Sequence, residues 1–573
     1  MKRIFFILFL ILQALLISGR QKLFSFKIKP KSEEQTWQEQ AQTYLDGLSL
    51  EQKIGQMFMV GFGGTSMPSS LVNNISQYYF GNFIYFGNNV ADDSLVPALS
   101  TAIQNTVVEK TGIPGFISMD QEGGMVVRFA NNATHFIGNM GLVATNRADY
   151  AYRVGQFSAQ ELRHYGVNLN LAPALDVNNN PNNPVIGIRS YADDPRLVAS
   201  YGTMMIKGLR AGEVMATAKH FPGHGDTSVD SHYGLPQIAH PMDHLLANEL
   251  WPFQAAIDQG IDAIMSAHIV FPALDTKYPA TLSKKVITDL LRKQMGFQGI
   301  VMTDSMNMDA ISKNFGVAEA AVLAVNAGVD LLLYGESTTL SVQAYRGVLA
   351  AARNGTISEE RINEAVLRIL SKKAKYNLFN DYLPRLNLTK ADFALHKRFS
   401  DQLIRKSITL AKGSVKHFSI NKSTLFVSSV CTRYPLVPGY QVSSNHNSFA
   451  YVASNHFKTL GMTDVAYEVI GTSVNATKIE ALLSKAASYE QVVIAVENAS
   501  SSQAQLVKRL FADHPNLIVV ALRNPYDINS YPEINHFICT YGYFASSVFA
   551  VFDLLAGEYE AEGLMPVFVQ GLQ

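Results

Sequence analysis

Eight short apolar segments, spread over residues 54–335, constrain the fold of this chain more than any other feature. They are IGQMFMVGF (54–62), GNFIYFG (81–87), GFISMD (115–120), VNLNLAP (167–173), VMATAKH (214–220), IDAIMSAH (261–268), GIVMTD (299–304) and VDLLLYG (329–335). Between most of them lie segments with apolar residues at helical spacing, such as 149–166 and 318–328. Near-continuous apolar strands that alternate with helices are typical of a parallel sheet covered on both faces.

The number of these units selects the architecture. Eight strand–helix units fit a (β/α)8 TIM-type barrel with some long loops. An open doubly wound sheet is the competing interpretation, but no glycine-rich dinucleotide fingerprint follows the first apolar segment. We therefore expect an α/β chain whose catalytic barrel spans residues 40–378.

A smaller α/β unit is expected after the barrel. Residues 358–375 predict a helix with Ser358 as its N-cap, which closes the barrel region. Residues 379–405 are mixed and polar, and we assign them to a linker. Residues 406–573 then form a C-terminal α/β sandwich domain, in which RNPYDI (523–528) is readily explained as a turn. Its predicted strands are the apolar runs 423–430, 491–497 and 516–524.

Composition excludes several classes of protein. The chain has 573 residues, enough for two or three domains, and 47% hydrophobic with 16% charged residues indicates a well-packed globular protein. The formal net charge of zero gives no electrostatic reason to expect a nucleic acid as partner. Cys431 and Cys539 are too few for a disulfide framework, and we expect small buried side chains.

Residues 1–30 have the pattern of an export segment. Lys2 and Arg3 precede an apolar run over 4–17, which is shorter than a membrane span. A good cleavage site and a lipobox cysteine are both missing, so the segment is either a signal peptide or an uncleaved N-terminal anchor. We expect an exported protein that is periplasmic, on the cell surface or secreted, with membrane attachment only if the anchor persists.

Titratable residues follow four of the eight apolar segments. They are Asp120, Lys219 with His220, His268 and Asp304. One aspartate at a strand end means little, since aspartate is also a common helix N-cap. In a barrel, however, catalytic residues lie where strands end and the following loops begin. We expect the active site at this end of the barrel.

The segment KHFPGHGDTSVDSHYGLP (219–236) first suggests a metal site. It contains His220, His224, His232, Asp226 and Asp230. A catalytic zinc would need three ligands and an open fourth position. No H-E-x-x-H spacing is present, and a loop with three glycines would hold ligands poorly. We therefore expect no metal and no cofactor, with His224 as a structural histidine.

Acid–base chemistry explains the same loop better. A retaining glycosidase needs a carboxylate nucleophile and, about 5–5.5 Å away, a group that protonates the leaving oxygen. Asp304 suits the first role. His232 beside Asp230 suits the second, because a carboxylate can fix the tautomer of an imidazole and raise its basicity. The glycines around them allow the loop to move after substrate binds.

Segment 219–236 resembles the signature of glycoside hydrolase family 3 β-N-acetylglucosaminidases. The tail from 524 to 567 resembles the family's C-terminal domain, so the resemblance covers about 45–570. Asn377 replaces a glycine common in the family. Six further segments resemble it in the same order: MDQEGGMVVRF, NLNLAPALDV, IGIRSYADDP, MSAHIVFPALD, VMTDSMNM and AVNAGVDLLL.

The resemblance implies a retaining exo-β-N-acetylglucosaminidase with Asp304 as nucleophile, His232 as acid/base and Asp230 as the residue that orients it. The implied sugar-binding residues are Asp120, Arg128, Arg189, Lys219 and His220. The substrate would be a small GlcNAc-containing glycan or muropeptide, bound by a monomer. A β-glucosidase, a phosphorylase and a non-catalytic sugar-binding cell-wall protein are the alternatives, and the aglycone stays open.

Overall fold

The structure is a computed structural model. The predicted export segment, 1–30, lies outside the residues that it describes. Within the described ranges, no helix is both long enough and apolar enough to span a bilayer. The structure describes residues 32–129, 133–336, 338–383, 386–436 and 442–572.

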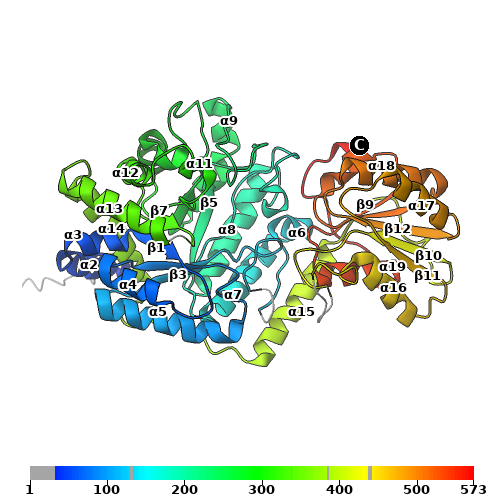
Figure 1. Cartoon of the computed structure of the whole chain (residues 1–573), viewed down its shortest axis with the longest axis horizontal. Helices are drawn as coiled ribbons and strands as arrows, with labels where there is room; N and C mark the ends of the chain where they lie inside the picture. Colours follow the sequence, from blue (N-terminus) through cyan, green and yellow to red (C-terminus); the bar gives the residue numbers. More distant parts are fainter. Residues whose placement is uncertain (1–31, 130–132, 337, 384–385, 437–441, 573) are drawn as a thin grey trace, which may run out of the picture.

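Eight parallel strands form the barrel that the sequence predicts (Figure 1). Each strand pairs with its neighbours in chain order, and β1 also pairs with β8. A parallel bridge between Met302 and Leu331 joins β7 to the segment that leads into β8 and closes the ring. The strands are β1 (Phe58–Gly61), β2 (Asn82–Tyr85), β3 (Phe116–Met119), β4 (Leu169–Asn170), β5 (Met215–Phe221), β6 (Ala263–Ser266), β7 (Ile300–Thr303) and β8 (Leu332–Tyr334).

Alternate residues of the strands face two different cores. Met59, Ile84 and Met302 belong to the apolar cluster that fills the barrel interior. Phe58 and Phe83, one residue away on the same strands, pack outward in a cluster shared with the surrounding helices. Because successive side chains of a strand point to opposite faces, only a strand buried on both sides has this near-continuous apolar pattern.

The helices of this region include those that the sequence predicts. Ser358 caps α14 by accepting a hydrogen bond from the Arg361 N–H. The helices are α2 (Glu33–Asp46), α3 (Leu50–Gln56), α4 (Ser69–Tyr78), α5 (Val96–Thr111), α6 (Asn139–Ala144), α7 (Ala148–His164), α8 (Pro195–Ala211), α9 (Met242–Ala247), α10 (Leu250–Asp258), α11 (Asp309–Ser312), α12 (Val317–Ala327), α13 (Thr338–Arg353) and α14 (Glu359–Lys375). A π-helix (Lys285–Gln294) and 3₁₀ helices at Asp93–Leu95, Gly187–Arg189 and Ala280–Leu282 complete the set.

The end of α14 closes the barrel at the amino ends of the strands. Lys373 is fully buried there and donates to Gln56 and to the Gly81 carbonyl. Asn377, which follows α14, has φ 58°. Asparagine tolerates this left-handed conformation better than most residues, so the replacement of the family's glycine has a structural reason.

The C-terminal domain has a six-stranded sheet in the order β11-β10-β12-β13-β14-β9. The three predicted strands are present, but β9, β11 and β14 were not predicted. Two of these are edge strands, and all three are short or only half-buried, so their apolar signal is weak. The elements are β9 (Thr409–Lys412), β10 (Thr424–Ser428), α16 (Phe449–Thr459), β11 (Val465–Val469), α17 (Ala476–Ala486), β12 (Gln491–Val496), α18 (Ser501–Asp513), β13 (Ile518–Ala521), β14 (His536–Cys539), α19 (Ala545–Leu555) and 3₁₀ helices at Pro525–Ser530 and Gln570–Leu572.

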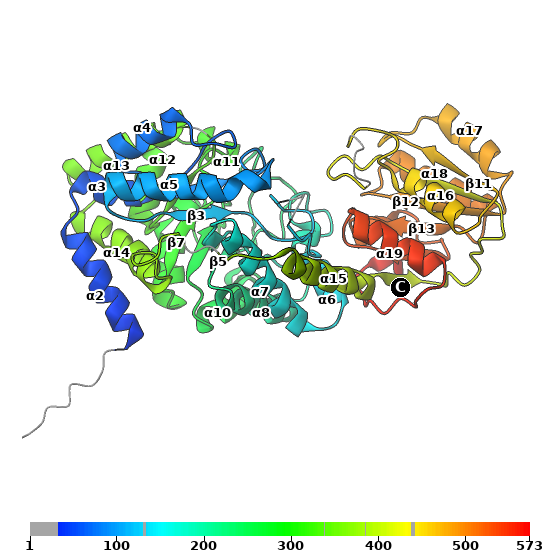
Figure 2. The same cartoon turned by 90° about the horizontal axis from the view of Figure 1, so that it is seen from below.

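Most of the predicted linker is a helix. α15 (Lys390–Ser407) starts with a capping box of Thr389 and Asp392 and runs from the barrel to the second domain (Figures 1 and 2). His396 on α15 pairs with the buried Glu161 of α7 at 2.8 Å. The connection is therefore a packed element of the structure.

The second domain packs on the loops that follow β3 and β4. Met125 and Ile188 of the barrel belong to the same apolar cluster as the core of the C-terminal domain. Tyr434 donates to the Met125 carbonyl at 3.0 Å, and Asn178 donates to Tyr526 at 2.8 Å. The RNPYDI segment forms a 3₁₀ helix that contacts the barrel through Tyr526. Both cysteines are buried and unpaired.

Candidate active site

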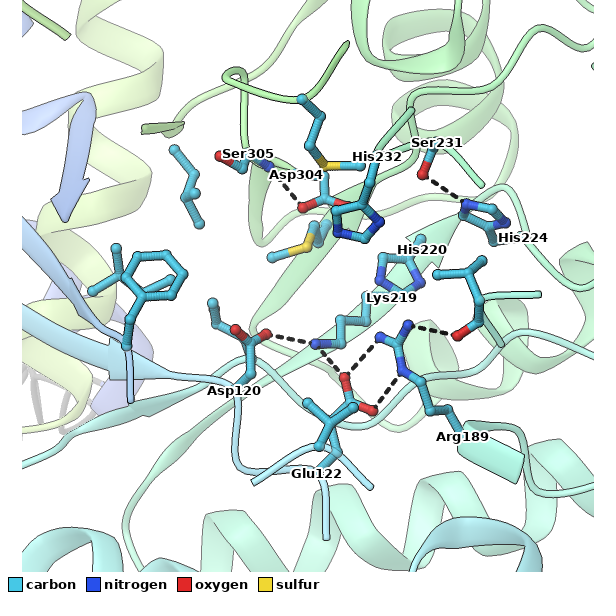
Figure 3. A pocket seen from close by; sticks show the side chains of 18 of the residues that line it. Asp120, Glu122, Arg189, Lys219, His220, His224, Ser231, His232, Asp304 and Ser305 are labelled. Carbon is cyan, nitrogen blue, oxygen red and sulfur yellow. Dashed lines mark hydrogen bonds and ion pairs between the residues drawn. The ribbon is translucent and has the colours of Figure 1, made fainter. Parts of the chain in front are cut away.

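A pocket of about 410 Å³ opens at the carboxyl ends of the barrel strands (Figure 3). Seven of the eight predicted site residues line it: Asp120, Arg128, Arg189, Lys219, His220, His232 and Asp304. The eighth, Asp230, lies behind His232 and pairs with its ring. The strand-end residues therefore meet in one place, as the barrel geometry predicts.

Four charged side chains form one wall of the pocket, here named the charged floor: Asp120, Glu122, Arg189 and Lys219. The Lys219 ammonium contacts Asp120 at 2.8 Å and Glu122 at 2.7 Å. Arg189 binds both oxygens of Glu122, at 3.0 and 2.9 Å. Arg128 adds a contact to Asp120 at 2.7 Å. The side chains of Lys219 and Glu122 are each only 2% exposed, so the network is held out of water.

Mutual pairing keeps the charged floor ionised. Burial raises the pKa of Glu122, but the positive charges of Arg189 and Lys219 outweigh burial and hold it at about 2. Asp120 behaves in the same way, since Lys219 and Arg128 hold its pKa below the ordinary value. Burial lowers the pKa of Lys219, but Asp120 and Glu122 more than compensate and raise it. The pocket thus offers fixed charges for hydrogen bonds to sugar hydroxyls.

His220 and His224 are both fastened to Asp176, a buried carboxylate after β4. His220 Nδ1 lies 2.8 Å from Asp176 Oδ2, and the backbone N–H of His224 donates to Oδ1 at 2.7 Å. The His224 ring is also paired with Ser231 at 2.9 Å, and burial lowers its pKa to about 4. These partners give His224 the structural role that we expect from the sequence.

The zinc hypothesis for this segment finds no support in the geometry. The rings of His220, His224 and His232 do not gather into a group with metal spacing within the described residues. Each is paired with a different side chain. The histidines of segment 219–236 thus serve separate roles.

Asp304 directly follows β7 and is not a helix N-cap, because the next helix starts at Asp309. Its Oδ1 accepts a hydrogen bond from the Ser305 N–H at 2.6 Å. Burial raises the pKa of Asp304, but His220, His268 and the Ser305 N–H outweigh it and hold the pKa below its ordinary value. The carboxylate is thus ionised and fixed in the pocket, as a nucleophile must be.

Residues 226–240 form a loop over the pocket, here named the loop arm. Its His232 is 55% exposed, and Nδ1 lies 2.7 Å from Asp230 Oδ1. Nε2 makes no hydrogen bond to any described residue, and Figure 3 shows the ring beside Asp304. The arrangement leaves one ring nitrogen oriented and the other available for proton transfer.

The glycines before the loop arm have a packing role. A Cβ on Gly225 would lie 1.5 Å from the Val177 carbonyl oxygen. Gly223 has φ 146°, and a Cβ there would press on Glu249 at 2.9 Å. The base of the arm is therefore packed closely, and the freedom expected from glycine is confined to the segment beyond Gly225.

The family follows from sequence comparison. Residues 49–372, more than half of the chain, match the model of the glycosyl hydrolase family 3 N-terminal domain. The chain belongs to glycoside hydrolase family 3. The match covers the whole barrel and therefore every predicted site residue.

Similar proteins within family 3 indicate which glycosidase activity this chain has. A β-N-acetylglucosaminidase structure from Paenibacillus sp. FPU-7 is 38% identical with a TM-score of 0.83, over 91% of this chain and 99% of that one. Beta-hexosaminidase A of Pseudoalteromonas piscicida is 35% identical over 64% of this chain and 67% of its own length. Beta-hexosaminidase of Xanthomonas campestris pv. campestris is 34% identical over 51% of this chain and 88% of its own length. This family 3 enzyme is a β-N-acetylhexosaminidase with a carbohydrate substrate.

Sequence reasoning missed three residues of the family 3 pocket and its immediate support: Glu122, Asp176 and Arg433. Glu122 and Asp176 lie within the motifs of the resemblance, but nothing in their spacing shows that they hold Lys219 and His220. His268, which the sequence does place at the end of the sixth apolar segment, donates from Nε2 to the Ser305 carbonyl at 3.0 Å. Arg433 lines the pocket from the C-terminal domain, so only the tertiary structure brings it there.

Proposed function

We propose that this enzyme is a retaining exo-β-N-acetylglucosaminidase that removes terminal GlcNAc from peptidoglycan fragments or related β-linked glycans. The observation that supports this most directly is the pairing of His232 Nδ1 with Asp230 beside Asp304 in one pocket. A nucleophile and a proton donor facing one cavity are what a double displacement requires.

The proposed reaction has two steps. Asp304 attacks the anomeric carbon while His232 gives its Nε2 proton to the leaving glycosidic oxygen, so the aglycone leaves as a neutral alcohol. Neutral His232 then takes a proton from water, whose oxygen attacks the same carbon and releases GlcNAc and the free carboxylate. Asp230 accepts a hydrogen bond from Nδ1–H throughout and stabilises the imidazolium form of His232.

The charged floor would hold the sugar that reacts. Carboxylates accept hydrogen bonds from sugar hydroxyls, and the cations of Lys219 and Arg189 donate them. Since these groups are already ordered by each other, they lose little conformational freedom when the sugar binds. A pocket of about 410 Å³ lies within the size range of small-ligand sites, which supports the removal of one terminal sugar at a time.

Arg433 favours an acidic aglycone among the candidate substrates. It is exposed, lines the pocket from the second domain, and makes no ion pair in the described part of the chain. A peptide-free GlcNAc–MurNAc fragment carries the lactyl carboxylate next to the GlcNAc linkage, and a muropeptide carries carboxylates on its stem peptide, whereas a chitin oligomer carries none. An unpaired guanidinium at this position would attract such carboxylates.

Two assays test the proposed reaction. The enzyme should hydrolyse 4-nitrophenyl β-N-acetylglucosaminide far faster than the β-glucoside, and added phosphate should not increase the rate. A 5-fluoro-GlcNAc donor should label the enzyme covalently, with the label on the peptide that contains Asp304. Labelling of another carboxylate, or none with an active enzyme, would overturn the mechanism; faster turnover with phosphate would instead indicate phosphorolysis.

Arg433→Gln tests the aglycone. We expect kcat/KM on a GlcNAc–MurNAc fragment to fall by about tenfold, roughly 1.4 kcal/mol, with little change on chitobiose. Lys416→Gln, another exposed cation of the second domain, is the matched control. An equal loss on both substrates would contradict a role in recognising the carboxylate.

We also propose that the enzyme acts outside the cytoplasm, on the strength of the basic and then apolar pattern of residues 1–30. Fusion of this segment to a reporter that is active only after export tests it. An inactive, cytoplasmic fusion would contradict the proposal.

A further inference from the structure

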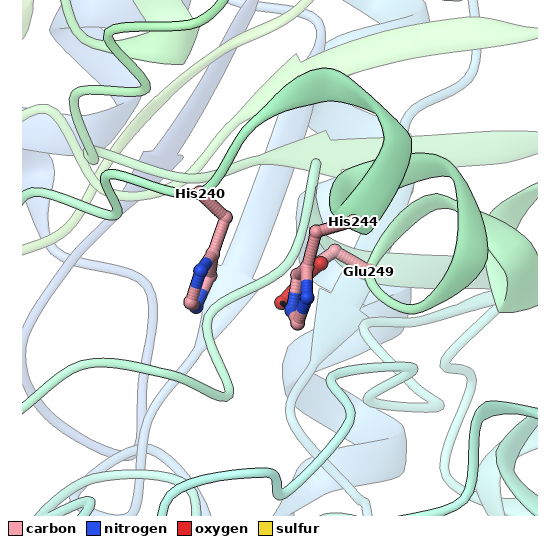
Figure 4. Close-up of side chains that lie close together, drawn as sticks. All are labelled: His240, His244 and Glu249. Atoms are coloured by element: carbon pink, nitrogen blue, oxygen red, sulfur yellow. Dashed lines mark ion pairs between the residues drawn. The ribbon is translucent and has the colours of Figure 1, made fainter.

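We propose that His240, His244 and Glu249 form a zinc site, with Asp226 as the carboxylate partner of His240, and that this site fastens both ends of the loop arm. His240 precedes α9, His244 lies on α9, and Glu249 directly precedes α10 (Figure 4). The site is separate from the catalytic pocket, which none of these four residues lines. It would hold the segment that carries Asp230 and His232.

The three side chains already converge. One ligand atom from each of His240, His244 and Glu249 lies within 4.8 Å of the other two. The imidazoles stack with centroids 3.9 Å apart, and His244 Nε2 lies 3.6 Å from Glu249 Oε1. Asp226 Oδ2 contacts His240 Nε2 at 2.5 Å. This is the only group of three or more such ligands with metal spacing in the described part of the chain.

The state of Glu249 is an independent indication of a ligand. Its side chain is only 1% exposed, and Asn179 donates to Oε1 at 2.9 Å. Oε2 and the Nε2 of His244 have no hydrogen-bond partner among the described residues. A buried carboxylate oxygen without a partner is costly. A cation between these groups would satisfy both.

The donor set selects the metal. Imidazole nitrogens and carboxylate oxygens suit Zn²⁺, whereas Mg²⁺ and Ca²⁺ prefer sites made of oxygen alone. Two neutral imidazoles and two carboxylates balance the charge of one Zn²⁺. Three protein ligands with metal spacing leave one tetrahedral position for a water, and none of the three lines the catalytic pocket. The ion would therefore take no part in breaking the glycosidic bond.

The sequence positions of the ligands give the site its role. Asp226 and His240 are 14 residues apart and mark the two ends of the loop arm. Glu249 is anchored by Asn179 and packs against Gly223. A bound ion would tie both ends of the arm to this anchor and leave residues 230–233, with the exposed His232 and Tyr233, between them. It would thus restrict the arm at its base without holding His232 itself.

Metal binding to the full-length enzyme tests the site. Protein treated with EDTA and desalted is titrated with ZnCl₂ by calorimetry, at a pH about one unit above the ordinary pKa of histidine (~6.5). We expect one ion per chain. His244→Gln and Glu249→Gln should each weaken binding by at least about 100-fold, since even indirect partners of a metal are worth 10–100-fold.

Two controls separate this site from other histidines. His417→Gln with His536→Gln removes a second ring pair, 4.3 Å apart, in the C-terminal domain and should leave binding unchanged. His232→Gln should also leave it unchanged. Stoichiometric binding that survives both cluster variants, or that is lost only in His232→Gln, would overturn the proposal. So would the absence of stoichiometric binding to the wild-type protein.

Two further measurements use the wild-type protein and therefore do not depend on whether a variant folds. Zn²⁺ should slow hydrogen exchange in peptides from 226–240 of the wild type and raise its Tm, since a ligand that binds only the folded state stabilises it. Co²⁺ in place of Zn²⁺ should give the intense visible bands of a tetrahedral site. Unchanged exchange in a protein that binds the ion would show that it does not fasten the loop arm.

Discussion

The charged floor and the loop arm both pair carboxylates with basic side chains at the same end of the barrel. The pairs of the floor are buried, whereas the pair of the arm is partly exposed to solvent. In the floor, Lys219 and Glu122 are almost completely buried and each has at least two charged partners. In the arm, His232 is half exposed and its charged partner lies two residues away in the chain. The first pairing depends on the tertiary fold, whereas the second is local and can move as one unit.

This difference matches two demands of glycoside hydrolysis. The sugar ring must be held in one orientation while its anomeric carbon reacts, which favours groups fixed by their neighbours. The proton donor must reach an oxygen of a variable aglycone and let the product leave, which favours a group on a loop. Asp304 lies where the two regions meet.

Asp304→Asn should have the largest effect, because both regions would act on the sugar carbon that Asp304 is proposed to attack. We expect kcat to fall by about 10⁴-fold or more on every substrate, as for other nucleophile deletions. The asparagine keeps the oxygen that accepts the Ser305 N–H. Asp309→Asn, at a partly exposed ion pair with Lys313, is the control and should leave kcat unchanged. A loss below tenfold would show that another group is the nucleophile.

Lys219→Met should destabilise the fold by about 3–5 kcal/mol, because it leaves Asp120 and Glu122 buried with one cation fewer. Urea denaturation measures this loss. Lys397→Met, which breaks an exposed pair with Asp401, should cost less than about 1 kcal/mol. If both substitutions had similar small effects, the floor would not be the rigid region described above.

His232→Ala should reduce catalysis and leave the stability of the fold nearly unchanged, in contrast to Lys219→Met. Its stability should stay within about 0.5 kcal/mol of the wild type, since the side chain is exposed and its contacts are local. The kcat on a natural disaccharide should fall by about 10²-fold, but much less on a nitrophenyl glycoside, whose leaving group needs no proton. An equal loss on both substrates would contradict the acid/base role.

The smallest effect is expected when the pH is changed and the rate of glycosylation by the His232→Ala enzyme is measured. A dinitrophenyl glycoside needs no acid, so glycosylation should depend on the ionisation of Asp304. Because the pKa of Asp304 lies below its ordinary value, the carboxylate stays more than about 90% ionised from pH 7 to pH 5. The stopped-flow rate should therefore change by less than twofold over this range and fall only in stronger acid. A midpoint near pH 6 would refute the low pKa.

Local patterns were enough to predict the barrel and the titratable residues at its strand ends, whereas Arg128 and Arg189 were predicted from the family resemblance. Each of the eight apolar segments contains a strand, and seven predicted residues line one pocket. The predicted linker is wrong over α15, because its many polar residues obscure the amphipathic pattern and its packing against Glu161 is a contact across 235 positions. Short edge strands such as β9 were missed for lack of apolar length.

The sequence by itself determined which residues we propose for the chemistry, since Asp304 lies at a strand end and Asp230 and His232 lie in a loop with a distinctive composition. Only the tertiary structure decided which charges are paired. Glu122 and Asp176 pair with Lys219 and His220 from the segments that follow β3 and β4, and Glu249 packs against Gly223, before the loop arm, from the start of α10. The sequence shows the periodicity of each helix or strand and the length of each loop. Burial of a side chain and pairing between distant segments arise only when the barrel has closed.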